Sequence, residues 1–134
     1  MKLADSVSFL RLEARCFGMR YNRNSLYYWR PILDYCWAYK AVQEETIVGG
    51  VIAMPTRQGL VYINSLFVDP RVRGLGIGSR LLEKVLGISA PGFILDVKSG
   101  KRYLIEMYQR HGFKVVRRER NYYLDGSERI IMRR

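Results

Sequence analysis

The chain has 134 residues, and this length predicts one domain, 1–134, with a hydrophobic core of its own. Its hydrophobic content of 49% and charged content of 26% are typical of a globular protein and exclude a disordered chain. The net charge of +11 favours anionic partners such as phosphate-bearing cofactors or nucleic acid, although a solvated basic surface also explains it.

The sequence shows no motif for membrane insertion, secretion or metal binding. No apolar run reaches the roughly 18 residues of a membrane span, and the first residues do not resemble a signal peptide. We therefore expect a cytoplasmic protein that does not enter a membrane. Cys16 and Cys36 stand apart and are expected to be reduced, and His111 is the single histidine, so no metal is expected.

The first half of the chain predicts two helical segments and then strands. Apolar spacing predicts a helix over 6–16 with Asp5 as N-cap, and a second helical segment over 24–36. Residues 37–55 are expected to form a strand, a polar turn and a second strand, with a bulge at Gly49 and Gly50. A further strand is predicted over 60–68.

The second half alternates helices and strands. A glycine-rich stretch opens a helix that Gly87 ends, and a strand over 93–98 and a helix over 101–110 follow. Residues 113–134 predict a hairpin with its turn at Asp125–Gly126. This order predicts an α/β (α+β) domain with a mixed, mainly antiparallel sheet flanked by helices.

The glycines in 69-DPRVRGLGIGSRLL-82 indicate an anion site. Their spacing, Gly74-x-Gly76-x-Gly78, matches neither the dinucleotide fingerprint nor the nucleoside triphosphate loop. It still places backbone N–H groups at the start of a helix directly after a strand, where anions bind. A plain strand–helix turn is the structural alternative.

Two motifs together resemble one family. The pattern Val68-x-Pro70-x-x-Arg73-x-x-Gly76-x-Gly78 resembles motif A of the GNAT acetyltransferases. Farther on, Leu95-Asp96-Val97-Lys98, Tyr108, Gly112-Phe113 and 122-YYLDG-126 follow at the spacing of the RimI-type branch, which acetylates protein N-termini, including those of ribosomal proteins. The resemblance implies a GNAT fold, here with a short or missing first strand.

The resemblance also implies acetyl-CoA as co-substrate and a set of residues that contact it. The strand end would pair with the pantetheine arm, and the Val68 N–H would face the acetyl oxygen. The glycine loop would take the pyrophosphate, guided by Arg71. Lys101 stands where the branch has an asparagine that contacts the coenzyme. The implied cofactor-binding residues are Leu66, Phe67, Val68, Arg73, Gly74, Leu75, Gly76, Ile77, Gly78, Ser79 and Lys101.

The remaining roles also come from the resemblance. Tyr108 matches the general acid that protonates the departing thiolate, and the alternative is a tyrosine of the core. Asp96 replaces a glutamate that serves as general base. It is one methylene shorter and would reach the amine through a water, and strand alternation equally predicts a solvated carboxylate. Tyr122 and Tyr123 would flank the peptide groove, or serve packing.

The acceptor is expected to be a protein N-terminus. At pH 7 about 10% of an α-amine with a pKa near 8 is unprotonated, against about 0.04% of a lysine near 10.4. A short carboxylate is a weak base and suits the α-amine. The surplus of positive charge fits a substrate on or near the ribosome. The alternatives are a small-amine acetyltransferase of the same fold, and a basic RNA- or ribosome-binding module with little or no catalysis.

Overall fold

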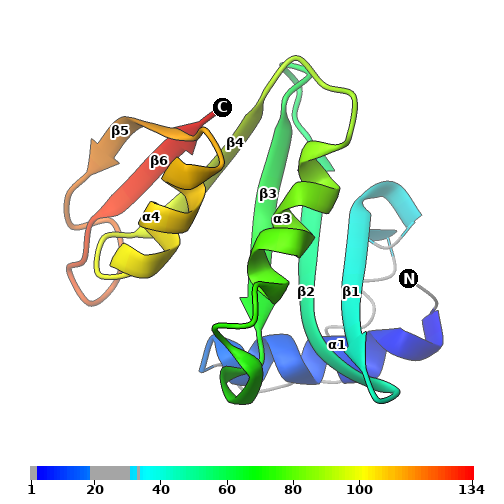
Figure 1. Cartoon of the computed structure of the whole chain (residues 1–134). Coiled ribbons are helices and arrows are strands. Elements are labelled where there is room, and N and C mark those ends of the chain that lie inside the picture. The colour runs from blue at the N-terminus through cyan, green and yellow to red at the C-terminus, as the bar shows by residue number, and fades with distance from the viewer. Residues whose placement is uncertain (1–2, 19–30, 33) are drawn as a thin grey trace. The chain divides into compact units, whose positions relative to one another are not determined.

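The computed structural model describes residues 3–18, 31–32 and 34–134. Most of the second expected helix, 24–36, lies outside these residues, and residues 31–32 and 34–35 of it are helical. The elements in chain order (Figure 1) are α1 (Leu3–Cys16), β1 (Trp37–Gln43), β2 (Thr46–Pro55), β3 (Val61–Val68), the 3-10 helix η1 (Pro70–Val72), α3 (Ile77–Leu86), β4 (Phe93–Lys98), α4 (Arg102–Arg110), β5 (Lys114–Glu119) and β6 (Arg129–Arg133).

Among the described residues, six strands form one sheet in the order β1-β2-β3-β4-β6-β5. β3 and β4 run parallel, pairing Val61–Ile63 with Phe93–Leu95, as expected for strands joined through a helix. The β1–β2, β4–β6 and β5–β6 pairs are antiparallel. This mixed, mainly antiparallel sheet confirms the predicted fold class, and the first described element is a helix.

The chain divides into two compact units. The first comprises Met1–Met54 and Asn64–Ser89, and the second comprises Pro55–Ile63 and Ala90–Arg134. The boundary runs through β3, whose start belongs to the second unit and whose end belongs to the first. The expectation of one domain over 1–134 remains a prediction.

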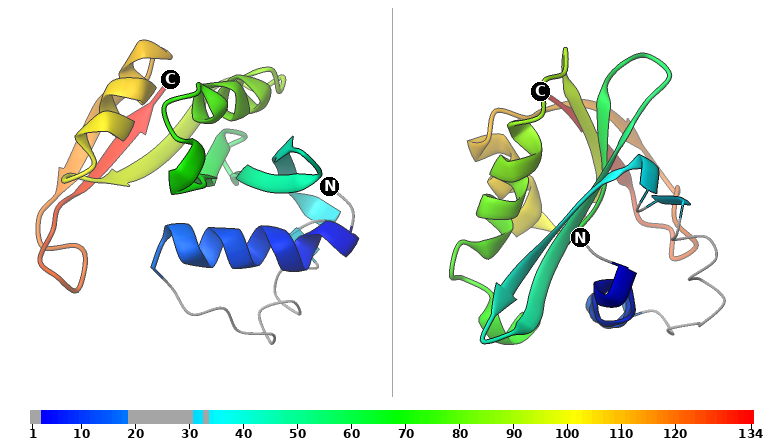
Figure 2. Two further views of the ribbon diagram at one scale, coloured as in Figure 1. Left: turned by 60° about the horizontal axis from the view of Figure 1, so that its bottom comes forward. Right: turned by 90° about the vertical axis from the view of Figure 1, so that its right-hand side faces the viewer.

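In the first unit, α1 and α3 cover opposite faces of the strands (Figure 2). The core beneath α1 joins Phe9 and Leu12 to Ile52 of β2 and Phe67 of β3. The rings of Phe9 and Phe67 meet edge to face at 4.9 Å between their centroids. Gly50 makes this approach feasible, because a Cβ there would lie 2.2 Å from the Phe9 ring.

In the second unit, α4 lies along β4 and β6 (Figures 1 and 2). Leu95 and Val97 of β4 are buried, and their direct partners on β6, Met132 and Ile130, are buried as well. Residues that are opposite each other on antiparallel strands share one face. The intervening Asp96 therefore points to the other face, as strand alternation predicted.

Three local features differ in detail from the predictions. α1 begins at Leu3, so Asp5 lies in its first turn rather than at the N-cap. The β1–β2 ladder is irregular where Ala41 and Val42 pair with Gly49 and Ile47, so the extra residue of β2 is Val48, directly beside the predicted bulge at Gly49 and Gly50. β5 and β6 form the predicted hairpin, and the nine residues 120–128 connect them. Within this loop the N–H of Gly126 donates to the carbonyl of Tyr123 at 2.8 Å, and the Asp125 carboxylate accepts from the backbone N–H of Ser127.

Candidate functional site

The end of β3 is anchored by Asp69. This side chain is 2% exposed, accepts from the backbone N–H of Arg71 at 3.0 Å, and pairs with the guanidinium groups of Arg71 and Arg15, each at 2.7 Å. The hydrogen bond from the Arg71 side chain is the main cause that lowers the pKa of Asp69. The structure thus engages Arg71 with a carboxylate, whereas the sequence suggested a role for it at a pyrophosphate.

The carbonyl group of Val68 is held by two side chains. Arg73 Nε donates to it at 3.2 Å, and the Cys16 thiol approaches it at 3.5 Å. Burial raises the pKa of that thiol, which together with the free state of both cysteines fits the expected reduced form. The backbone at the end of β3, where acetyl transfer was predicted, is therefore fixed from both α1 and the glycine loop.

The glycine loop presents an open backbone. Gly74 and Gly76 have φ values of 81° and 75°, and a Cβ at either would meet no atom within 4 Å. Gly76 is the N-cap of α3, and no side chain caps this helix end. The first N–H groups of α3 thus have no side-chain acceptor, and the positive end of the helix dipole lies at the same position. Both features favour an anion there.

The face of the second unit opposite α4 carries a hydrogen-bonded charge network. The Tyr62 hydroxyl donates to Asp96 Oδ1 at 2.5 Å, and an Arg129 terminal nitrogen donates to the same oxygen at 3.3 Å. Arg129 Nε lies 3.2 Å from Asp96 Oδ2, an ion-pair contact without hydrogen-bond alignment. Arg129 also donates to Glu119 at 3.2 Å. Asp96 is therefore partnered, rather than a solvated carboxylate.

Two residues of this network, Tyr62 and Arg129, were missed by sequence reasoning. Burial, and then the hydrogen bond to Asp96, raise the pKa of Tyr62. Tyr62 alternates along β3 with the buried Val61 and Ile63, which places it on the other face of the strand. That alternation could have predicted the face on which Tyr62 lies. The contact of Tyr62 and Arg129 with Asp96 depends on the strand order β3–β4–β6, which cannot be read from the sequence.

Tyr108 lies on α4 and is buried, with 5% of its surface exposed. Its ring meets that of Phe113 edge to face at 5.9 Å. Burial is the main cause that raises the pKa of the Tyr108 hydroxyl, so this group stays protonated at neutral pH. Lys101, predicted to contact the coenzyme, is exposed at the N-terminus of the same helix.

The predicted substrate tyrosines lie in the loop between β5 and β6. The rings of Tyr122 and Tyr123 meet edge to face at 5.1 Å, and Tyr122 is 53% exposed. The Arg129 guanidinium stacks 4.6 Å from the Tyr122 ring, and the Lys98 ammonium lies 5.5 Å from the Tyr123 ring while pairing with Asp125. Arg129 thereby joins this loop to Asp96 within the second unit.

The predicted site residues thus fall into two sets. The first unit holds the end of β3 and the glycine loop, with Leu66–Val68 and 73–79. The second unit holds Asp96, Lys101 and Tyr108 together with the loop tyrosines. Over 3–18, 31–32 and 34–134, no group of three or more potential metal ligands occurs. No helix within these ranges is long and apolar enough to cross a membrane.

Comparisons with known proteins identify relatives. The profile of the Acetyltransferase (GNAT) family matches residues 7–113. The chain is 40% identical over 57 residues to the peptidyl-lysine N-acetyltransferase YjaB of Salmonella typhimurium, a match that covers 42% of this chain and 39% of YjaB. It is 34% identical over 74 residues to the N-alpha-acetyltransferase RimI of Mycobacterium tuberculosis, covering 54% of this chain and 47% of RimI. The matches thus span less than half the length of these relatives.

A solved structure extends the likeness over the whole chain. Arabidopsis thaliana Naa50, in complex with the bisubstrate analogue CoA-Ac-MVNAL, has a TM-score of 0.83 and 25% sequence identity. This match covers 100% of the present chain and 94% of that chain. The predicted resemblance to the GNAT fold, and within it to RimI-type proteins, is confirmed by these matches.

Proposed function

Because the chain belongs to the Acetyltransferase (GNAT) family, we propose that it transfers the acetyl group of acetyl-CoA to an amine, namely the N-terminal α-amine of a protein. The observation that carries this proposal is the uncapped N-terminus of α3, reached through an open glycine loop directly after β3. Similarity to RimI, an N-alpha-acetyltransferase, supports the α-amine as acceptor.

The glycine loop fits the pyrophosphate of acetyl-CoA. Open space around Gly74 and Gly76 lets a phosphate approach the backbone, where a side chain would shield the N–H groups. Gly78 and Ser79 lie in the first turn of α3, and Lys101 is an exposed cation at the start of α4. The β3–β4 ladder ends at Ile63 and Leu95, so Leu66, Phe67 and Val68 lie beyond it and suit the proposed pairing with pantetheine.

The reaction requires the protein to stabilise an oxyanion, to protonate the departing thiolate and to accept a proton from the amine. The amine nitrogen attacks the thioester carbon, and the N–H of Val68 stabilises the oxyanion that forms. As the carbon–sulfur bond breaks, Tyr108, which is protonated at neutral pH, donates its proton to the thiolate. The amine loses a proton to a base, and the products are an amide and free coenzyme A. Direct attack is expected because neither cysteine lies in a nucleophile motif.

We assign the proton acceptor to Asp96, through a bridging water. Its carboxylate already accepts from Tyr62 and Arg129, which fix its orientation. A carboxylate is a weak base and suits an α-amine, a fair fraction of which is already unprotonated at neutral pH.

The loop tyrosines are proposed to hold the acceptor peptide. Tyr122 is held by Arg129, and Tyr123 by Lys98, so both rings are presented from a fixed loop. Aromatic rings with fixed orientation are effective contacts for peptide backbones and side chains. A ribosomal protein N-terminus agrees with the excess of 23 basic over 12 acidic residues, which favours an anionic assembly.

A lysine side chain is the second candidate acceptor, because YjaB is a peptidyl-lysine N-acetyltransferase. The deciding experiment measures thiol release from acetyl-CoA with peptides varied at their first two residues. A matched panel has a blocked N-terminus and one internal lysine. We expect turnover with free N-termini and little with the blocked panel. Robust acetylation of the blocked peptides alone would establish the lysine reading, and salt-sensitive RNA binding without any turnover would favour the binding module.

A further inference from the structure

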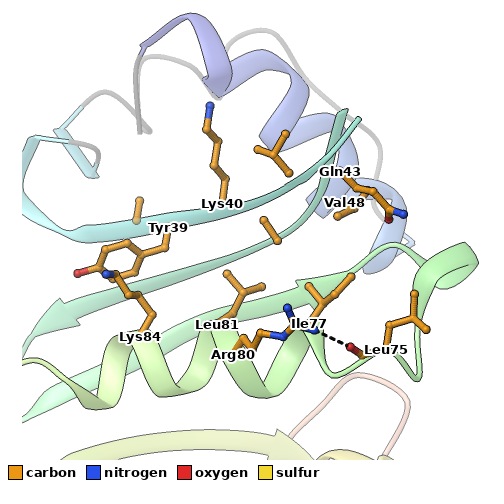
Figure 3. A pocket seen from close by; sticks show the side chains of 12 residues that line it. Tyr39, Lys40, Gln43, Val48, Leu75, Ile77, Arg80, Leu81 and Lys84 are labelled. Atoms are coloured by element: carbon orange, nitrogen blue, oxygen red, sulfur yellow. Dashed lines mark hydrogen bonds between the residues drawn. The ribbon is translucent and has the colours of Figure 1, made fainter. Parts of the chain in front are cut away.

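A groove lies between β1 and α3 in the first unit (Figure 3). Its volume is about 660 Å³, and it follows β1 over most of its length, from Ala38 to Gln43. Leu81 and Val48 form part of its apolar floor, while Leu75 and Ile77 extend it to the glycine loop. The lining thus belongs to the sheet edge and to α3, apart from the proposed reacting groups.

One wall of this groove is the edge of the sheet. β1 is the first strand in the sheet order, and over the described ranges it pairs with β2 alone. An edge strand presents backbone N–H and C=O groups that another extended segment can pair with. A groove beside such an edge therefore suits a peptide that is added as a strand, with its side chains filling the hollow.

The charges that line the groove indicate which kind of peptide segment would bind there. The lining includes Lys40, Arg80 and Lys84 and no carboxylate. Lys84 is exposed and lies over the ring of Tyr39, 5.8 Å from its centroid. Figure 3 shows Tyr39 and Lys84 side by side between β1 and α3, and Lys40 directed toward the opposite face. On that face Lys40 pairs with Asp5 at 2.7 Å.

We propose that this groove docks an extended segment of a partner protein in which acidic and apolar residues alternate. The acidic side chains enter the groove, where their carboxylates meet Arg80 and Lys84 and their methylene groups cover the apolar floor at Leu81. The apolar side chains lie on the other face, beside Val42, which is 51% exposed. Side chains of an added strand alternate between these two faces, so one segment satisfies both.

A second copy of the chain fits this edge less well. Two β1 strands paired about their centre would bring each Lys40 opposite its counterpart, and the cations of both grooves would face each other. Like charges in directly opposed positions destabilise a strand pair. The charge of the lining therefore favours an acidic segment over self-association.

The test uses the full chain and a fluorescein-labelled heptapeptide with alternating valine and glutamate. Its binding is followed by fluorescence anisotropy, and amide NMR shifts locate the contact. A second peptide carries lysine in place of each glutamate, and a third carries proline at alternate positions, which removes backbone donors. We expect the glutamate peptide to bind and to shift β1 and Lys84 signals, and both other peptides to bind at least tenfold more weakly.

Charge reversal provides the matched comparison. Lys84→Glu is expected to weaken binding of the glutamate peptide about fivefold or more, because an attractive charge pair becomes a repulsive one. Arg57→Glu makes the same change of charge at an exposed site outside the groove and is expected to have little effect. Equal weakening by both variants, equal binding of the glutamate and lysine peptides, or shifts that leave β1 and α3 unaffected would overturn the proposal. So would a concentration-dependent dimer that Lys84→Glu alters. Acetyl transfer plays no part in these measurements, so they stand apart from the proposed function.

Discussion

At the scale of single residues, the second unit places an acid and a base candidate in different surroundings. Tyr108 is buried against Phe113, and burial keeps its hydroxyl protonated. Asp96 lies on the opposite face of its strand, with Tyr62 and Arg129 as partners. The Tyr108 hydroxyl therefore carries a proton that it can give, and the Asp96 carboxylate is held in place by its partners.

Tyr108→Phe tests the acid. The variant keeps the ring that meets Phe113 and loses the hydroxyl, so we expect kcat to fall about 100-fold while the melting temperature changes little. Steady-state thiol release and thermal unfolding are measured together. Tyr103→Phe, at a 53% exposed position of the same helix, is the control and is expected to be silent. Unchanged turnover in Tyr108→Phe would remove this residue from the chemistry.

Asp96→Asn tests whether Asp96 accepts a proton or only holds neighbouring side chains in place. If Asp96 takes the proton, kcat falls much further in Asp96→Asn than in Arg129→Gln, and this is the result we expect. If Asp96 only holds Arg129 and Tyr62, the two variants lose kcat equally and the melting temperature drops. Arg129→Gln serves as the companion variant, because it disturbs the same network and leaves the carboxylate in place.

At the scale of elements, the chain's close packing depends on small residues as much as on large ones. α1 reaches β2 and β3 through Phe9, whose ring fills the space above Gly50 and beside Phe67. The glycine-rich loop has the opposite character, because Gly74 and Gly76 face open space. Glycine thus serves contact between elements in one place and access to the backbone in the other.

Gly50→Ala measures the first of these roles. The added methyl group would lie 2.2 Å from the Phe9 ring, so we expect a loss of about 1–3 kcal/mol in the free energy of unfolding. Gly100→Ala is the matched control, since a Cβ there meets nothing within 4 Å. Adding Phe9→Leu to Gly50→Ala should recover part of the loss in chemical denaturation. Equal stability of the two alanine variants would contradict this account.

Local patterns predicted the elements better than the contacts between them. Alternation located β4 at the expected residues, and the glycine spacing located the start of α3, because both signals lie within a few neighbouring residues. The Asp-Gly pair located the hairpin turn but not the length of its loop, because such a pair also occurs in longer loops, where here Asp125 bonds to Ser127. The Asp96–Arg129 pair joins residues 33 apart, and no local pattern announces it.

At the scale of the whole molecule, the charge is strongly unbalanced, and buried carboxylates are few. Among the described residues, Glu13 and Asp69 are the buried acidic side chains. Glu13 accepts from the Ser65 hydroxyl at 2.6 Å, and burial is the main cause that raises its pKa. Asp69 instead has two arginines and a lowered pKa. With a net charge of +11, acid conditions add further repulsion to the folded state.

Asp69 is therefore expected to contribute to acid sensitivity. The pKa of Asp69 is lower in the folded protein than in the unfolded chain, where an aspartate has a pKa of about 3.9. Such a carboxyl stabilises the folded protein when the pH is above about 3.9, and this contribution is lost as the pH falls below that value. We expect Asp69→Asn to cost about 2 kcal/mol at pH 7. The difference from the parent chain should shrink as the pH falls below about 4 in urea titrations. Asp34→Asn, at an exposed aspartate, is the control, and a constant difference across this pH range would refute the assignment.

The groove along β1 and the loop after β3 have Leu75 and Ile77 in common, and Arg80 of the groove donates to the carbonyl of Leu75 at 3.3 Å. Two ligands that meet the same short backbone segment are thermodynamically linked, and the linkage is reciprocal. If a docked strand changes the affinity of the loop for coenzyme by some factor, the coenzyme must change the affinity for the strand by that factor. The affinity for a partner protein would then differ between the free chain and the chain with bound acetyl-CoA.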